Sequence, residues 1–159
     1  MQKDRLMYLL LHQIMELYKN NINFMGRLHK ILGYGGLVPF FGFALLYYVF
    51  NEPWNFVLVV YSALIFSFLS GLLWASTLNH EPPKHTLYVS VGAMLWSFLW
   101  IFWMPGKQNY FPIIIPFSFI ALHCYERIYL SKIYPTSFLK LRMHLSLFVA
   151  AILFLVCFI

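Results

Sequence analysis

The sequence predicts an all-α, polytopic membrane protein, a bundle of five transmembrane helices preceded by an amphipathic helix at the membrane surface. Apolar residues make up 62% of the chain and charged residues 10%, whereas soluble domains average about 45–50% and about 25%. Five apolar runs each reach the roughly 20 residues that cross a bilayer. The segments between them, such as "NEPW", "NHEPPKH" and "MPGKQN", carry turn-forming residues. A soluble globule of 159 residues leaves too much of its surface in water for this composition, so the lipid bilayer is the predicted surrounding.

Residues 1–30 are predicted to form an amphipathic helix with a basic flank on the inner face of the membrane. Arg5, His12, Glu16 and Lys19 are spaced seven, four and three residues apart, which places them on one helical face. The apolar face is supplied by Leu6, Leu9, Leu10, Ile14 and Leu17. Because polar residues interrupt every long apolar stretch here, the segment is not expected to be a signal peptide. An interfacial helix is the favoured interpretation, and a helix that binds a partner fits the same pattern.

The bundle itself is predicted over residues 31–159, and its first span, residues 31–50, opens with the glycine-rich stretch "LGYGGLVPF". A phosphate-binding loop would need a preceding strand and a following Lys-Ser or Lys-Thr pair, and neither is present. Gly33, Gly35 and Gly36 are instead expected to allow close approach of helices in lipid. Pro39 lacks the N–H that would bond the carbonyl of Gly35, which predicts a kink or a pocket near the inner end of this span.

The second span, residues 55–77, contains a stripe of small residues within "YSALIFSFLSGLLWA", a run that also includes Tyr61 and Trp74. A small residue recurs at every fourth position, at Ala63, Ser67, Gly71 and Ala75. Helices in lipid associate through close van der Waals contact. The stripe therefore predicts a central packing seam within the chain, where Gly71→Leu would be disruptive, and a homodimer face is the alternative.

The remaining spans are residues 86–104, 110–130 and 138–159. Trp96 and Trp100 lie one turn apart in the third span and could line a pocket for a flat ligand. Contact with the core or with lipid is the favoured interpretation of these tryptophans. Pro112 and Pro116 are expected to bend the start of the fourth span.

The distribution of Lys and Arg predicts an N-in, C-out orientation. With five spans, Lys107 is the one basic residue placed outside. The inner side receives Lys3, Arg5, Lys19, Arg27, Lys30, Lys84, Arg127, Lys132, Lys140 and Arg142. The formal net charge of +6 is then explained by anionic lipid at the inner face, and no nucleic-acid partner is needed.

Three segments together resemble the signatures of one small membrane-protein family. They are "LGYGGLVPF" in the first span, "YSALIFSFLSGLLW" in the second and "YPTSFLKLRMHLSL" at the start of the fifth. They resemble the uncharacterised family that includes transmembrane protein 69, and the resemblance covers nearly everything after Gly26. It implies about five spans and no stated activity. The chain departs from the family pattern of the second segment at Ser70, Leu73 and Ala75.

Few ionisable groups fall within the spans, and those that do are candidate sites. Glu126 and Arg142 lie near the inner ends of neighbouring spans, where they could form an ion pair. An anionic-headgroup or substrate site around Arg142 is the functional alternative, and a snorkelling arginine is the favoured one. His123 and His144 could hold a haem between them, although no cofactor is the favoured expectation. No metal site is expected, since the cysteines and the remaining histidines lack ligand spacing.

No catalytic set can be assembled from these residues, so an enzyme is not the favoured class. The leading hypothesis is an accessory, assembly or stabilising subunit that acts through helix contacts, within a membrane protein complex or a homodimer. The alternative is a binder or carrier of a lipid, quinone or porphyrin. The expected location is the inner (cytoplasmic) membrane, or the mitochondrial inner membrane in a eukaryote.

Overall fold

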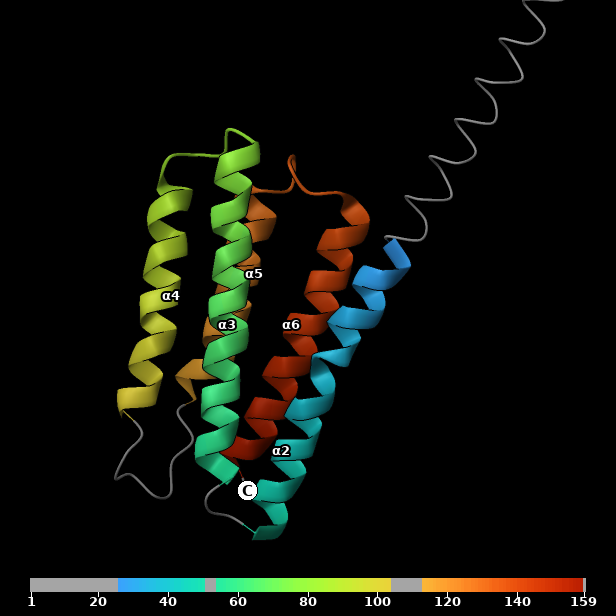
Figure 1. Ribbon diagram of the computed structural model, residues 1–159, viewed down its shortest axis with the longest axis vertical. Helices are drawn as coiled ribbons and strands as arrows, with labels where there is room; N and C mark the ends of the chain where they lie inside the picture. The colour runs from blue at the N-terminus through green and yellow to red at the C-terminus, as the bar shows by residue number, and fades with distance from the viewer. Residues whose placement is uncertain (1–25, 51–53, 104–112, 159) are drawn as a thin grey trace, which may run out of the picture. The chain divides into compact units, whose positions relative to one another are not determined.

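The computed structural model describes residues 26–50, 54–103 and 113–158, and these are α-helical apart from short connections, with no strand among them. The chain divides into two compact units, Met1–Gly35 and Gly36–Ile159. Residues 26–35 of the first unit are helical, and the interfacial helix predicted for the preceding residues lies outside the described part. The second unit contains the helices α2 (Leu37–Phe50), α3 (Trp54–Asn79), α4 (His85–Trp103), α5 (Ile114–Tyr129) and α6 (Thr136–Cys157) (Figure 1).

Proline fixes several of these helix boundaries. Pro82 and Pro83 follow α3, and a residue that precedes proline is disfavoured in the helical region. Pro135 is the N-cap of α6, and its carbonyl accepts bonds from the N–H groups of Phe138 and Leu139 at 3.0 and 3.1 Å. As a result, α3, α4 and α6 begin and end within two residues of the predicted spans.

The glycine-rich stretch contains a turn. Gly36 separates the helical residues 26–35 from α2, which begins at Leu37. Pro39 therefore lies in the first turn of α2, where a backbone N–H would have no partner within the helix. The missing N–H thus costs α2 no internal hydrogen bond.

Four helices are long and apolar enough to cross a membrane: Gly26–Phe50, Trp54–Leu78, His85–Phe102 and Thr136–Cys157. The predicted fourth span, residues 110–130, is not matched by a described helix of that length. The described helix there, α5, has 16 residues, and at about 1.5 Å per residue it is shorter than a hydrocarbon core of about 30 Å. It also carries two charged residues near its end, Glu126 and Arg127.

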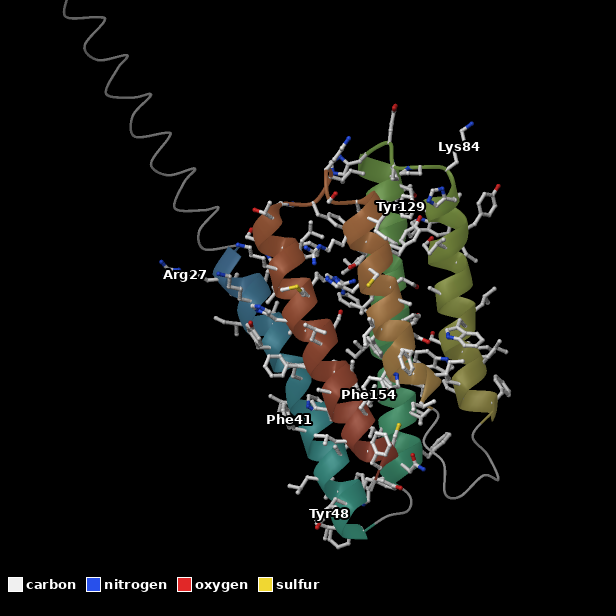
Figure 2. The ribbon with its side chains drawn as sticks, turned by 180° about the vertical axis from the view of Figure 1, so that it is seen from behind. Arg27, Phe41, Tyr48, Lys84, Tyr129 and Phe154 are labelled. Carbon is white, nitrogen blue, oxygen red and sulfur yellow. The ribbon has the colours of Figure 1, made fainter. Side chains whose placement is uncertain are left out.

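The second unit is built from two antiparallel hairpins, α3–α4 and α5–α6, with α2 packed against α3 and α6. The two hairpin connections lie at the same end of this unit (Figure 1). Figure 2 shows Lys84 and Tyr129 at that end and Tyr48 at the opposite one. We call the end with the connections 80–84 and 130–135 the connection end.

Aromatic side chains join the helices in the middle of the unit. Phe119 of α5 contacts Phe66 of α3 edge-to-face, with ring centroids 5.2 Å apart, and Phe40 of α2 at 6.4 Å. Trp100 of α4 lies 5.0 Å from Phe66. The centre of the bundle is therefore filled by rings from four helices.

Large apolar side chains also cover the outside of the helices. Of the most apolar 18 residues in α3 and α6, 39% and 44% are buried inside the protein. The exposed ones include Phe41, Leu45, Leu64, Phe68, Phe98, Phe102, Phe117, Leu147, Phe148 and Leu155. So large an apolar exterior needs an apolar surrounding, and the apolar helices indicate a membrane-embedded protein.

Candidate functional site

An ion pair between α5 and α6 is the main polar feature of the interior. Arg142 Nε donates to Glu126 Oε2 at 3.1 Å, and Arg142 Nη2 donates to Glu126 Oε1. Glu126 is 1% exposed and Arg142 is 4% exposed. The structure therefore brings these two predicted residues together as a buried, bidentate pair, instead of extending Arg142 to the surface.

Local sequence explains why the two side chains meet. Glu126 lies in the last turn of α5 and Arg142 two turns into α6, and the connection between these helices is short. Leu130, the C-cap of α5, is fully buried and its N–H bonds the carbonyl of Glu126 at 2.9 Å. The tight turn thus places the carboxylate and the guanidinium at the same level of the hairpin, where the planar fork of arginine matches a carboxylate.

His123 lies beside this pair. It is 8% exposed, and its Nδ1 lies 4.0 Å from Glu126 Oε2. Neither ring nitrogen has a hydrogen-bond partner. His144 is exposed, so the structure does not present the two histidines to a shared interior, and the described residues contain no group of three potential metal ligands.

Tyr134 connects this hairpin to α3, a contact that the sequence did not indicate. Its hydroxyl donates to the carbonyl of Leu72 at 3.2 Å. Burial is the main cause that raises the pKa of Tyr134, and the negative charge of Glu126 also raises this pKa. A hydrogen bond with Ser76 and the positive charge of Arg142 lower it. A half-buried tyrosine in a connection is hard to recognise from sequence, because tyrosines are also common at membrane interfaces.

A second tyrosine connects the first two signature segments. The Tyr61 hydroxyl donates to the carbonyl of Gly36 at 2.9 Å, and its ring lies 4.9 Å from that of Phe40. Gly36 and Tyr61 thus take part in one contact between the start of α2 and α3, while Gly33 and Gly35 belong to the first unit.

The predicted stripe of small residues has different surroundings along its length. Ala63 is buried, Ser67 and Ala75 are half-buried, and Gly71 is exposed. A Cβ added at Gly71 would meet no atom within 4 Å, and Trp74 beside it is 46% exposed. The buried face of α3 shares Ala63 with this stripe and otherwise consists of Asn55, Leu58, Val59, Ser62, Phe66, Ser70, Leu73 and Ser76.

The two tryptophans of α4 face α5. Trp96 Nε1 donates to Ser118 Oγ at 3.0 Å. Trp100 is 3% exposed and packs on Phe66 and Phe119, and its Nε1 has no hydrogen-bond partner. Both side chains therefore belong to the contact between the two hairpins.

A family model described as "Protein of unknown function (DUF3429)" matches residues 25–158. No curated protein and no solved structure matches the chain.

Proposed function

The chain belongs to the DUF3429 family, which is described as of unknown function. We propose that this chain is a five-span membrane protein that acts as an accessory or stabilising subunit through contacts between helices. The narrower resemblance to transmembrane protein 69 fits the same proposal. No catalytic role is proposed.

The observation that carries this proposal is the contrast between the polar interior and the apolar exterior. The buried Glu126–Arg142 pair is closed on itself, so its charges are not offered to a substrate. Large apolar side chains, in contrast, cover the outer faces of α2 to α6. Such faces contact either lipid or the helices of another membrane protein.

We further propose an N-in, C-out orientation in the inner (cytoplasmic) membrane, or in the mitochondrial inner membrane of a eukaryote. This orientation counts five spans, so it requires that α5, together with the residues before it, cross the membrane. The exposed cations Lys84, Lys132 and Lys140 support it, because they share the connection end and basic residues favour the cytoplasmic side.

Cysteine labelling tests the orientation. In a background with Cys124→Ser and Cys157→Ser, Pro53→Cys should react with a membrane-impermeant maleimide added from outside, and Lys132→Cys should react only after permeabilisation. The reverse pattern contradicts the orientation.

Native mass spectrometry after gentle detergent extraction tests the accessory role. We expect a discrete membrane protein at fixed stoichiometry, and removal of the chain should lower the amount of that protein in the membrane. Unchanged levels of every co-purifying protein would contradict the role.

A small-molecule binder is the second candidate, favoured by the buried and unpaired Nε1 of Trp100. An unpaired buried donor is costly, and a carbonyl of a lipid, quinone or porphyrin would satisfy it. If the chain is a binder, the same mass spectra should show one small molecule bound per chain. Trp100→Phe should lose this molecule. The control Trp74→Phe, which changes a tryptophan on the exposed face of α3, should keep it.

A further inference from the structure

Exposed positive charge in the second unit is concentrated at the connection end. Lys84, Arg127, Lys132 and Lys140 are all exposed, and Figure 2 shows this end with Lys84 and Tyr129 labelled. No Lys or Arg occurs in α2, α3 or α4, or in α6 beyond Arg142. The described part of the opposite end therefore carries no basic side chain.

The two hairpins differ in how this charge is balanced. In the α3–α4 connection, Lys84 is accompanied by the exposed acid Glu81. In the α5–α6 hairpin, the acid Glu126 is buried and paired with Arg142, so it does not offset the exposed cations. Arg127, Lys132 and Lys140 are exposed at the connection end of this hairpin, and no exposed acid accompanies them within residues 113–158; we call these three residues the α5–α6 basic surface.

The surroundings of this surface suit a lipid molecule. Next to Arg127 on α5, Ile128 is 67% exposed and Tyr129 is 43% exposed. Further along the same hairpin, away from the connection end, Phe117 and Phe148 are exposed. An amphiphile with a negative headgroup and acyl chains matches a basic end that continues into apolar helix faces.

We propose that the α5–α6 basic surface binds the phosphate headgroup of an anionic phospholipid from the surrounding leaflet. Arg127 offers a planar fork of donors that matches phosphate oxygens, and Lys132 and Lys140 add charge on the connection and on α6. The acyl chains lie along the exposed apolar faces of α5 and α6. This inference rests on the membrane embedding of the proposed function, and it is independent of the accessory role.

Lipid competition monitored by native mass spectrometry tests the proposal. The full chain in mild detergent is mixed with equal amounts of phosphatidylglycerol and phosphatidylcholine, and the ratio of the two retained lipids is measured. A Lys or Arg near an anionic surface contributes about fivefold in affinity. We therefore expect phosphatidylglycerol to be preferred, and Arg127→Gln, Lys132→Gln and Lys140→Gln each to reduce the ratio about fivefold.

Lys84→Gln is the matched control, because it removes an exposed cation from the same end but from the other hairpin. Its ratio should stay close to that of the unmodified chain. Arg127→Lys keeps the positive charge but lacks the planar fork, so it should reduce the ratio less than Arg127→Gln does. All these side chains are exposed, so the variants should unfold at the same temperature as the unmodified chain.

Four results would overturn the proposal. Equal retention of the two lipids would show that the chain has no preference for the anionic headgroup. A fall in the lipid ratio in Lys84→Gln as large as in Arg127→Gln would show that the preference depends on net charge and not on this surface. Displacement of phosphatidylglycerol by inorganic phosphate alone assigns the surface to a free anion. A chain extracted from membranes by alkaline carbonate without detergent would contradict the membrane embedding itself, and the proposed function with it.

Discussion

The two hairpins of the second unit hold their polar side chains in opposite ways. In α3–α4, the serines bond carbonyls of their own helix, as Ser62 does to Leu58 at 2.8 Å and Ser97 to Met94 at 2.8 Å. In α5–α6, Glu126 and Arg142 bond each other across the two helices. The serines of the first hairpin therefore need no neighbouring helix for their hydrogen bonds, whereas Glu126 and Arg142 of the second each need the other.

The difference has a physical consequence for substitution. A serine that bonds its own helix can be removed together with its bond, and the carbonyl keeps its regular helical donor. A buried charge that loses its counter-ion is left in a medium of low dielectric. The α5–α6 hairpin should thus be sensitive to single changes that α3–α4 tolerates.

The largest effect is expected from Arg142→Met. It leaves the Glu126 carboxyl buried without a partner, and breaking a buried pair costs about 3–5 kcal/mol of unfolding free energy. The measurement is denaturant unfolding in detergent micelles. Glu126→Gln combined with Arg142→Met should recover much of the loss, and Lys140→Met, an exposed cation on the same helix, serves as the control. An Arg142→Met chain as stable as the unmodified one would contradict the comparison.

A smaller effect is expected from Tyr134→Phe, which removes the bond to the Leu72 carbonyl. The cost should be about 1 kcal/mol. Because burial holds the pKa of Tyr134 above its usual value, the folded chain retains this proton more firmly than the unfolded one. The contribution of Tyr134 to the unfolding free energy is complete below the pKa that this group has in the unfolded chain. It is lost as the pH rises through the pKa that Tyr134 has in the folded chain. The difference in unfolding free energy between the two chains should therefore be smallest at the highest pH. A difference that stays constant through the alkaline range would contradict the raised pKa of Tyr134.

Ser62→Ala should have a still smaller effect, within about 1 kcal/mol, because both the hydroxyl and its intrahelical bond disappear together. The same unfolding assay measures it. A cost as large as that of Arg142→Met would show that the α3–α4 hairpin also depends on its polar groups.

Gly71→Ala should have the smallest effect and should stabilise the chain by about 0.5–1 kcal/mol, because space around Gly71 is open and alanine favours the helix. Gly71→Leu should also leave the isolated chain folded, although the small-residue stripe by itself predicts disruption. Size-exclusion chromatography after extraction adds a second measurement. If the chain stays stable and yet loses a larger assembly, the exposed part of the stripe is a contact with another subunit.

The bounds of α3, α4 and α6 could be predicted because they depend on local information. An apolar run of sufficient length and a proline at each turn define a helix in lipid whatever packs against it. The length of α5 could not be predicted in this way. The apolar run of residues 110–130 is long enough to predict a span, but the described helix begins at Ile114 and ends at Tyr129, before the buried Leu130.

The candidate site was predicted in part. Glu126 and Arg142 were identified because charges within apolar runs are rare, and their pairing followed from the shared end of two neighbouring spans. The burial of His123, the role of Tyr134 and the exposure of Gly71 depend on the rotation of each helix about its axis. A sequence that is apolar all round a helix does not specify that rotation.

The sequence by itself determined that the chain is helical, apolar and basic at the ends of its predicted spans, since composition and periodicity are local properties of the chain. Only the tertiary structure decided which faces meet. It turned Trp100 towards Phe66 and Phe119, and Gly71 outward. The physical reason is that lipid gives no hydrophobic preference between the faces of such helices, so side-chain shape and the few hydrogen bonds between helices select the arrangement.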